Sequence, residues 1–205
     1  MRRSSYEGRE GELENLIIMQ FDNHGNFCIS EEEIIQVIYH ALKRLVTEDM
    51  HLFKSGVQER ALQFKLALYL RELLKIAECG GVYIDVEYNR DGESDVKRPN
   101  PNNDKKWFAP DIILHERGSA NYKCYDQYKN DIIYCEIKKK SKSGKPDAAR
   151  IKKQMRVRKY QYGIDIYSLR LNNISLDLYV LVNNRFDKKS YEYNFSEDRL
   201  NEITS

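Results

Sequence analysis

The segment that most constrains the fold of this chain is residues 131–138, with the sequence DIIYCEIK. Its density of Ile and aromatic residues between polar segments is typical of a short β-strand. Side chains along a strand alternate between two faces, so Tyr134, Glu136 and Lys138 project to one side. A strand this apolar is expected at the centre of a sheet, where a carboxylate and an ammonium each need a partner, a ligand or a metal ion. The segment therefore predicts a functional site at the end of a central strand.

A second apolar segment, residues 110–115 (PDIILH), offers a third charged group for this site. The segment predicts a short strand, and Asp111 stands at its start. If the two strands are neighbours, the Asp111 carboxylate joins Glu136 and Lys138. His115 has the same strand parity as Asp111, but we expect it to be structural or peripheral.

The order of the other elements follows from apolar periodicity and turn residues. Ser30, followed by three glutamates, predicts the start of a helix that ends near residue 47. A second helix is predicted to start at Ser55, whose spacing to Gln58 fits a capping box, and to end near Ala77 before two glycines. The remaining predictions are a hairpin within 16–29, strands at 82–88, 110–115 and 131–138, a helix from 146 to about 162 that stops at Gly163, strands at 164–171 and 175–182, and an edge strand near 191–195 followed by a few helical residues.

Glu59 is an unusual residue in the second predicted helix. Steps of three and four residues from Glu59 reach Leu62, Leu66 and Leu70, so the acid lies on the inward apolar stripe. One interpretation is an acid that caps the helix or complements its dipole. The other is an additional active-site carboxylate, and the sequence leaves both open.

Pro110-Asp111 with Glu136-Ile137-Lys138 resembles the motif of the PD-(D/E)XK nuclease superfamily. The motif is short, and the order of the predicted elements carries the rest of the resemblance. Helix, three strands, helix and strand is the αβββαβ core of the restriction-endonuclease-like fold.

The resemblance covers residues 55–182 and implies an α/β fold (α+β, with a mixed sheet) in which one strand is added to that core. We therefore expect residues 55–205 to form a nuclease-like domain, and residues 1–54 to form an N-terminal extension, hairpin plus helix, packed on it. The chain departs from relatives that carry Gln-x-x-x-Tyr on the second helix, because Gln154 is followed at that spacing by Arg158.

The resemblance also implies a chemistry: a metal-dependent endo- or exonuclease that hydrolyses phosphodiester bonds, with DNA as the expected substrate. Asp111, Glu136 and the backbone carbonyl of Ile137 would be the metal ligands, and such hard oxygen donors suit Mg²⁺, with Mn²⁺ as a substitute. Lys138 would orient or help to deprotonate the attacking water. Glu59 would hold a second metal ion or its water shell.

A basic run follows the candidate site. From Lys138 to Lys159 there are eleven Lys or Arg residues against the single acid Asp147, so the rest of the chain is acidic although the net charge is only +2. Binding of a nucleic-acid backbone explains this asymmetry, and a solvated charged surface is the alternative. The predicted contact residues are Lys139, Lys140, Lys142, Lys145, Lys152, Lys153, Arg156 and Lys159.

Two other functional classes fit the same residues. The chain can be a catalytically inactive nuclease-fold module that binds nucleic acid, or an unrelated α+β protein in which the polar triad is a coincidence. Cleavage that requires a divalent ion separates the first class from these two.

Composition limits the setting of the protein. The four cysteines form no CxxC pair, which favours free thiols in a reducing compartment over a zinc site. The N-terminal residues lead into no apolar segment, and no run approaches the length of a membrane span. A cytoplasmic location without membrane association is expected, and a homodimer is possible by analogy with nucleases that cut both strands.

Overall fold

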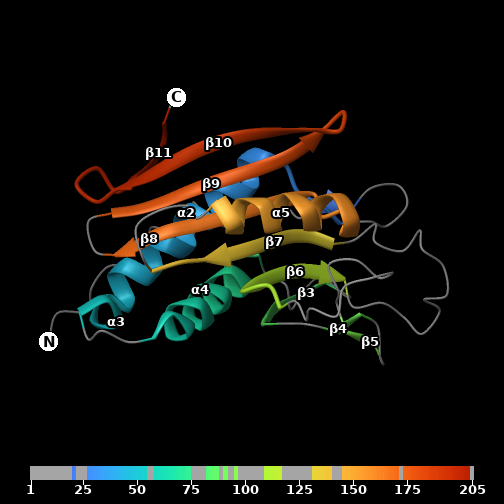
Figure 1. Ribbon diagram of the computed structural model, residues 1–205. Coiled ribbons are helices and arrows are strands. Elements are labelled where there is room, and N and C mark those ends of the chain that lie inside the picture. Colours follow the sequence, from blue (N-terminus) through green and yellow to red (C-terminus); the bar gives the residue numbers. More distant parts are fainter. Residues whose placement is uncertain are drawn as a thin grey trace, which may run out of the picture.

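The computed structural model describes residues 20–21, 27–54, 58–74, 82–87, 90–91, 95–96, 109–116, 131–139, 145–170 and 173–203. The strands of its main sheet are β3 (Val82–Val86), β6 (Ile112–Glu116), β7 (Asp131–Ile137), β8 (Tyr162–Arg170), β9 (Asn173–Val182), β10 (Arg185–Asn194) and β11 (Arg199–Ile203). Within the described residues they form one seven-stranded sheet in the order β11-β10-β9-β8-β7-β6-β3 (Figure 1). The fold is therefore mixed α/β, as the sequence predicted.

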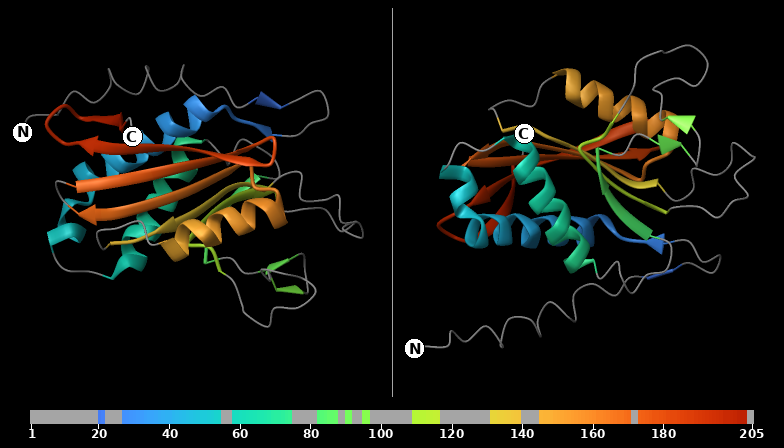
Figure 2. Two further views of the ribbon diagram at one scale, coloured as in Figure 1. Left: turned by 45° about the horizontal axis from the view of Figure 1, so that its top comes forward. Right: turned by 90° about the horizontal axis from the view of Figure 1, so that it is seen from below.

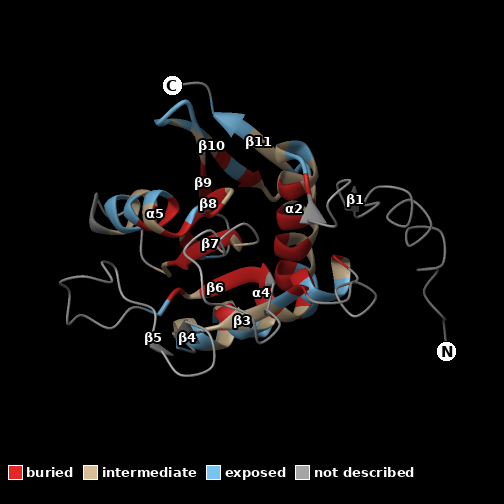
Figure 3. Ribbon diagram, turned by 90° about the vertical axis from the view of Figure 1, so that its right-hand side faces the viewer, coloured by how far each residue is buried: buried red, intermediate tan, exposed pale blue. Residues whose placement is uncertain are grey.

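Helices cover both faces of this sheet. α2 (Glu31–Glu48) and α4 (Glu59–Leu73), joined through the short α3 (Met50–Lys54), pack on one face, and α5 (Lys145–Arg158) packs on the other (Figure 3). The larger apolar core lies between α2, α4 and the sheet, and a smaller one lies under α5. None of the described helices is long and apolar enough to cross a membrane.

The position of β7 in the sheet follows from its composition and connections. Residues 132–137 are all buried, which is expected of a strand with neighbours on both sides and helices on both faces. β7 pairs antiparallel with β6 and parallel with β8, and α5 makes the crossover that a parallel pair requires. The charged residues at its end are thus placed inside the layered fold.

Of the two predicted N-terminal helix starts, one is confirmed and the other is wrong. α2 begins as expected, and it carries a complete capping box in which Ser30 and Glu33 bond each other's backbone N–H groups. The predicted start of the second helix at Ser55 is wrong, because α4 begins at Glu59 with Gln58 as an N-cap that makes no side-chain bond; Ser55 itself lies outside the described residues. The helix also ends at Leu73 rather than near Ala77.

The C-terminal half holds more strand than predicted. α5 ends at Arg158, where Lys159 turns the chain with a φ of 64°, and Gly163 lies inside β8 instead of stopping the helix. The expected edge strand is the long β10, and the expected helical residues are the edge strand β11, so two strands extend the sheet beyond β9. Each gains stability by completing the hydrogen bonds of its neighbour.

Two small hairpins lie outside the main sheet. β1 (Gln20–Phe21) pairs with β2 (Phe27–Cys28), as the N-terminal prediction has it, and β4 (Arg90–Asp91) pairs with β5 (Asp95–Val96) within the polar segment that follows β3. α2 shares its apolar core with α4 and the sheet. The proposed boundary at residue 54 stays a prediction.

Candidate functional site

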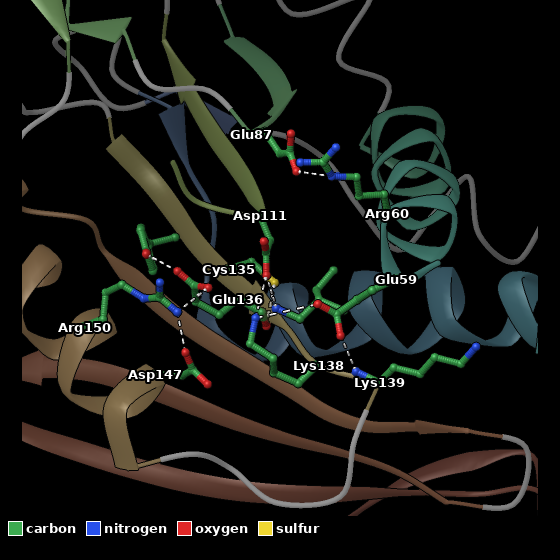
Figure 4. A network of polar contacts seen from close by, with 12 residues as sticks. Glu59, Arg60, Glu87, Asp111, Cys135, Glu136, Lys138, Lys139, Asp147 and Arg150 are labelled. Carbon is green, nitrogen blue, oxygen red and sulfur yellow. Dashed lines mark hydrogen bonds and ion pairs between the residues drawn. The ribbon is translucent and has the colours of Figure 1, made fainter. Parts of the chain in front are cut away.

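Four residues of the predicted site come together from three elements (Figure 4). Asp111 immediately precedes β6, Glu136 and Lys138 lie at the end of β7, and Glu59 is the first residue of α4. The β6–β7 register pairs Ile112 with Cys135 and so places Asp111 opposite Glu136. The structure brings Asp111, Lys138 and Glu59 into contact, and the sheet register places Glu136 beside Asp111.

Asp111 is fixed by the backbone of β7. Its Oδ2 accepts a hydrogen bond of 2.7 Å from the N–H of Ile137 and lies 3.8 Å from Lys138 Nζ. The N–H and C=O of a strand residue point to the same side of the strand, so we expect the Ile137 carbonyl on the side of β7 that borders β6. Burial raises the pKa of Asp111, against the opposing effect of the Ile137 N–H. Asp111 and the Ile137 N–H thus form one side of the site.

Glu136 is almost completely buried, with an exposed fraction of 1%. Tyr134 donates its hydroxyl hydrogen to Glu136 Oε1, and the Arg150 guanidinium lies 3.0 Å from Oε2. Burial, followed by the negative charge of Asp111, raises the pKa of Glu136 to about 8, although Tyr134 and Arg150 oppose the shift. Two carboxylates that disfavour each other's ionisation gain most when a cation binds near both.

Lys138 and Glu59 form the other side of the site. Lys138 Nζ lies 3.7 Å from Glu59 Oε1, and Glu59 Oε2 accepts a 2.7 Å hydrogen bond from the Lys139 N–H. Glu59 therefore ties the start of α4 to the residues that leave β7. Burial opposes the charge on Lys138, but the nearby carboxylates outweigh it and raise the pKa of its ammonium, so this group stays protonated.

The donor set fits a divalent ion in type. Two carboxylates and the Ile137 carbonyl offer the oxygen ligands that Mg²⁺ prefers. In the described part of the chain, no three His, Cys, Asp or Glu side chains gather as a group that could hold a metal by themselves. Glu59 already bonds the Lys139 backbone, and we therefore assign it a positioning role ahead of the predicted role in metal binding.

Arg150 is a residue of this network that the sequence analysis missed. It lies in the second turn of α5, and its side chain reaches both Glu136 and Asp147. Its position on the helix that connects β7 to β8 could have indicated that it lies near the site. The sequence could not show which residue it contacts, because that depends on how the helix packs on the sheet.

Two buried acids also escaped the sequence analysis. Glu136 pairs in register with Asp165 of β8, and Asp165 pairs with Asp177 of β9, so Asp111, Glu136, Asp165 and Asp177 stand in one row across four strands. Asp177 is bonded by Lys188 Nζ at 2.9 Å and by Ser190 Oγ at 2.7 Å. The sequence does contain a sign that Asp165 and Asp177 are buried, because each of them interrupts an apolar run.

The predicted basic contact residues separate into groups. Lys153 and Arg156 are exposed on α5, Lys152 is half-buried beside them, and Lys159 is exposed but lies beyond the helix. Lys152 Nζ lies 5.0 Å from the Tyr179 ring centre, and the Arg156 guanidinium lies 4.8 Å from that of Phe186. Lys139 contributes its backbone N–H to Glu59. Lys140, Lys142 and the side chain of Lys145 lie outside the described residues.

His115 lies away from these contacts, as expected of a structural residue. It is buried, and its Nε2 lies 2.8 Å from Asp85 Oδ2 on the neighbouring strand β3.

Comparison with known proteins found no match to this chain among family models, curated proteins or solved structures. The case for a function therefore rests on the residues and their contacts.

Proposed function

We propose that this chain is a divalent-metal-dependent nuclease that hydrolyses phosphodiester bonds in DNA. The observation that carries the proposal is the convergence of Asp111, Glu136 and Lys138 at the ends of two adjacent strands, with Glu59 closing the group from α4. The order α4, β3, β6, β7, α5, β8 supports the resemblance to the PD-(D/E)XK nucleases.

In this proposal each residue has a separate role. Asp111, Glu136 and the Ile137 carbonyl hold a Mg²⁺ or Mn²⁺ ion, which would offset phosphate charge and lower the pKa of a bound water. Lys138, held protonated by its acidic neighbours, stabilises negative charge on the phosphate and orients the water. Glu59 keeps Lys138 and the Lys139 backbone in place. The basic surface of α5 binds the nucleic-acid backbone, and a homodimer would bring two sites to a duplex.

A second candidate is a nucleic-acid-binding module without catalysis. It is favoured by one observation: both carboxylates already have a cation nearby, since Arg150 is ion-paired with Glu136 and Lys138 lies 3.8 Å from Asp111. Such pairs can stabilise a fold without performing chemistry.

Cleavage assays separate the two candidates. Plasmid DNA, single-stranded and duplex oligonucleotides and RNA are incubated with the full chain in Mg²⁺, in Mn²⁺ and in EDTA. The nuclease proposal expects cleavage that EDTA abolishes and that Asp111→Asn and Glu136→Gln each reduce by at least about two orders of magnitude. Asp187→Asn, an exposed acid on β10, is the matched control. Binding without any cleavage would favour the second candidate.

Metal binding gives a readout that needs no substrate. A ligand that binds the folded state raises its stability, so Mn²⁺ is expected to raise the melting temperature of the wild type but not that of Asp111→Ala or Glu136→Ala. An equal rise in all three proteins would contradict the ligand assignment.

A further inference from the structure

We propose that Arg150 competes with the divalent ion for Glu136 and that, once displaced, it binds a phosphate of the nucleic acid. The inference rests on the proposed function and adds to it a residue of α5 that couples metal binding to substrate binding.

Arg150 and Glu136 are in direct contact. The Arg150 guanidinium lies 3.0 Å from Glu136 Oε2, and Tyr134 donates to Oε1, so both oxygens of this buried carboxylate already have a donor. A Mg²⁺ ion binds oxygen at about 2.0–2.1 Å. An ion on Oε2 would therefore stand close to the positive guanidinium, and the two cations would repel each other.

The Arg150 side chain is far more exposed than that of Glu136. The Glu136 side chain is buried, with 2% exposed, whereas that of Arg150 is 41% exposed. The guanidinium also contacts Asp147, one turn earlier on α5. Asp147 can thus keep Arg150 at the edge of the site after it leaves Glu136 (Figure 4).

A displaced Arg150 can bind a phosphate of the nucleic acid. Arginine presents planar donors that match a phosphate, and α5 carries the exposed cations Lys153 and Arg156. Arg150 would extend this basic surface to the candidate site. The ordinary alternative is that Arg150 orients Glu136 for the metal, and the two roles predict opposite changes in metal affinity when Arg150 is removed.

Calorimetric titration of the full chain with MnCl₂ distinguishes them, with wild type, Arg150→Gln and Arg150→Lys compared. Competition expects Arg150→Gln to bind Mn²⁺ about tenfold more tightly than the wild type, with Arg150→Lys in between. Arg199→Gln is the matched control, because it also removes an arginine paired with a glutamate, Glu197, away from the site.

Cleavage measured on the same proteins is the second readout. Arg150→Gln is expected to bind metal more tightly and yet to cleave at least about tenfold more slowly, because a phosphate contact is lost. A protein that merely folds badly would lose both properties together. If Arg150→Gln does not fold, the same opposite changes are required of Arg150→Lys.

Each outcome decides the matter. Tighter metal binding with slower cleavage by Arg150→Gln supports the inference. Binding of Mn²⁺ by Arg150→Gln when the wild type and the other variants do not bind it supports the inference as well. Unchanged or weaker metal binding by Arg150→Gln, or the same gain in Arg199→Gln, overturns the inference and leaves the nuclease proposal intact. Failure of every protein to bind Mn²⁺ overturns both.

Discussion

Lys138 lies 3.7 Å from a carboxylate oxygen of Glu59 and 3.8 Å from one of Asp111, so one ammonium serves two acids. Neither contact is a short ion pair, and a third of the lysine side chain is exposed. The lysine is therefore held near the acids with its charge available to an incoming anion. This arrangement suits a group that stabilises charge on a substrate.

Replacing this lysine separates catalysis from metal binding. Lys138→Ala is expected to lower cleavage by about two to four orders of magnitude, the scale of a lost electrostatic or acid–base group, while Mn²⁺ binding measured by calorimetry is retained. Lys189→Ala is the control, since it removes a lysine that pairs with Glu31 of α2. The same loss of cleavage in both variants would contradict the role of Lys138.

At the scale of secondary-structure elements, the docking of α5 on β8 depends on a glycine. A Cβ on Gly163 would stand 2.5 Å from Met155 Sδ and still closer to Ile151 Cγ2, and both of these side chains are fully buried. The close approach of helix and sheet means that a side chain at this position would force Ile151 and Met155 to shift. α5 also supplies Arg150, so the same contact positions part of the candidate site.

Enlarging this glycine therefore tests the packing. Gly163→Ala is expected to destabilise the protein by about 1–3 kcal/mol, the range for overpacked cores, in urea unfolding. Met155→Ala also destabilises when made alone, but in the double variant it removes one of the two side chains that the new methyl group would clash with, the other being Ile151. The combined cost should therefore be smaller than the sum of the two single costs. A simple sum would show that the contact does not limit the packing.

A second contact between elements joins α2 to α4. Asp49, the C-cap of α2, is buried, accepts a hydrogen bond from the Tyr69 hydroxyl and lies 3.2 Å from Lys65 Nζ. Burial alone would raise the pKa of Asp49, but the bonds from Tyr69 and Lys65 outweigh it and lower the pKa below its ordinary value. The carboxylate is thus a stabilising part of the α2–α4 contact.

This contact has a defined pH dependence. Because the pKa is lower in the folded state, the stability that Asp49 supplies is present above its unfolded pKa of about 3.9 and is lost as the pH falls through the folded value. Asp49→Asn is expected to be less stable than the wild type at neutral pH by about 1–3 kcal/mol, with the difference narrowing in acid. Urea unfolding of both proteins from about pH 7 down to about pH 3 measures this stability difference. A difference that does not change with pH would contradict the stabilising role of the Asp49 carboxylate.

For the molecule as a whole, two cations of α5 differ from many others in the groups that they contact. α2 and α4 bury the larger core on one face, while α5 covers part of the other and β10 and β11 extend past it (Figure 2). Many cations of the described residues pair with carboxylates, such as Lys43 with Asp198 and Lys189 with Glu31. Lys152 and Arg156 instead lie over aromatic rings, and within the described part of the chain no ion pair holds them.

A polyanion can therefore engage Lys152 and Arg156 of α5 without breaking an ion pair of the described residues. Replacing Lys152, Lys153 and Arg156 with Gln is expected to weaken nucleic-acid binding equally across sequences and to lower the slope of log affinity against log salt by roughly one unit per lost phosphate contact. Fluorescence anisotropy at several salt concentrations measures the slope. The control replaces Lys43, Lys189 and Arg199, which are ion-paired, with Gln. An unchanged slope would mean that the α5 cations are only solvated.

Much of the fold could be predicted because its signals are local. The apolar runs at β6, β7, β8 and β9 and the capping residues of α2 depend on neighbours in the sequence. The order of the helices and main-sheet strands from α4 to β9 was predicted correctly, without the small β4–β5 hairpin. The errors fell where a distant contact overrides a local signal. Gly163 resembles a helix stop, yet it is required by the packing of α5 on β8, and the C-terminal residues become strands because β9 and β10 offer edges to pair with.

The sequence by itself determined which charged residues stand at the ends of β6 and β7, because the alternation of faces along a strand and the neighbouring apolar residues can be read directly from it. Only the tertiary structure decided what each charge contacts. Sheet register set Asp111 opposite Glu136, the start of α4 placed Glu59 on the Lys139 backbone, and the docking of α5 gave Arg150 to Glu136. These contacts join residues far apart in the chain, and they form only when the sheet and its helices have packed.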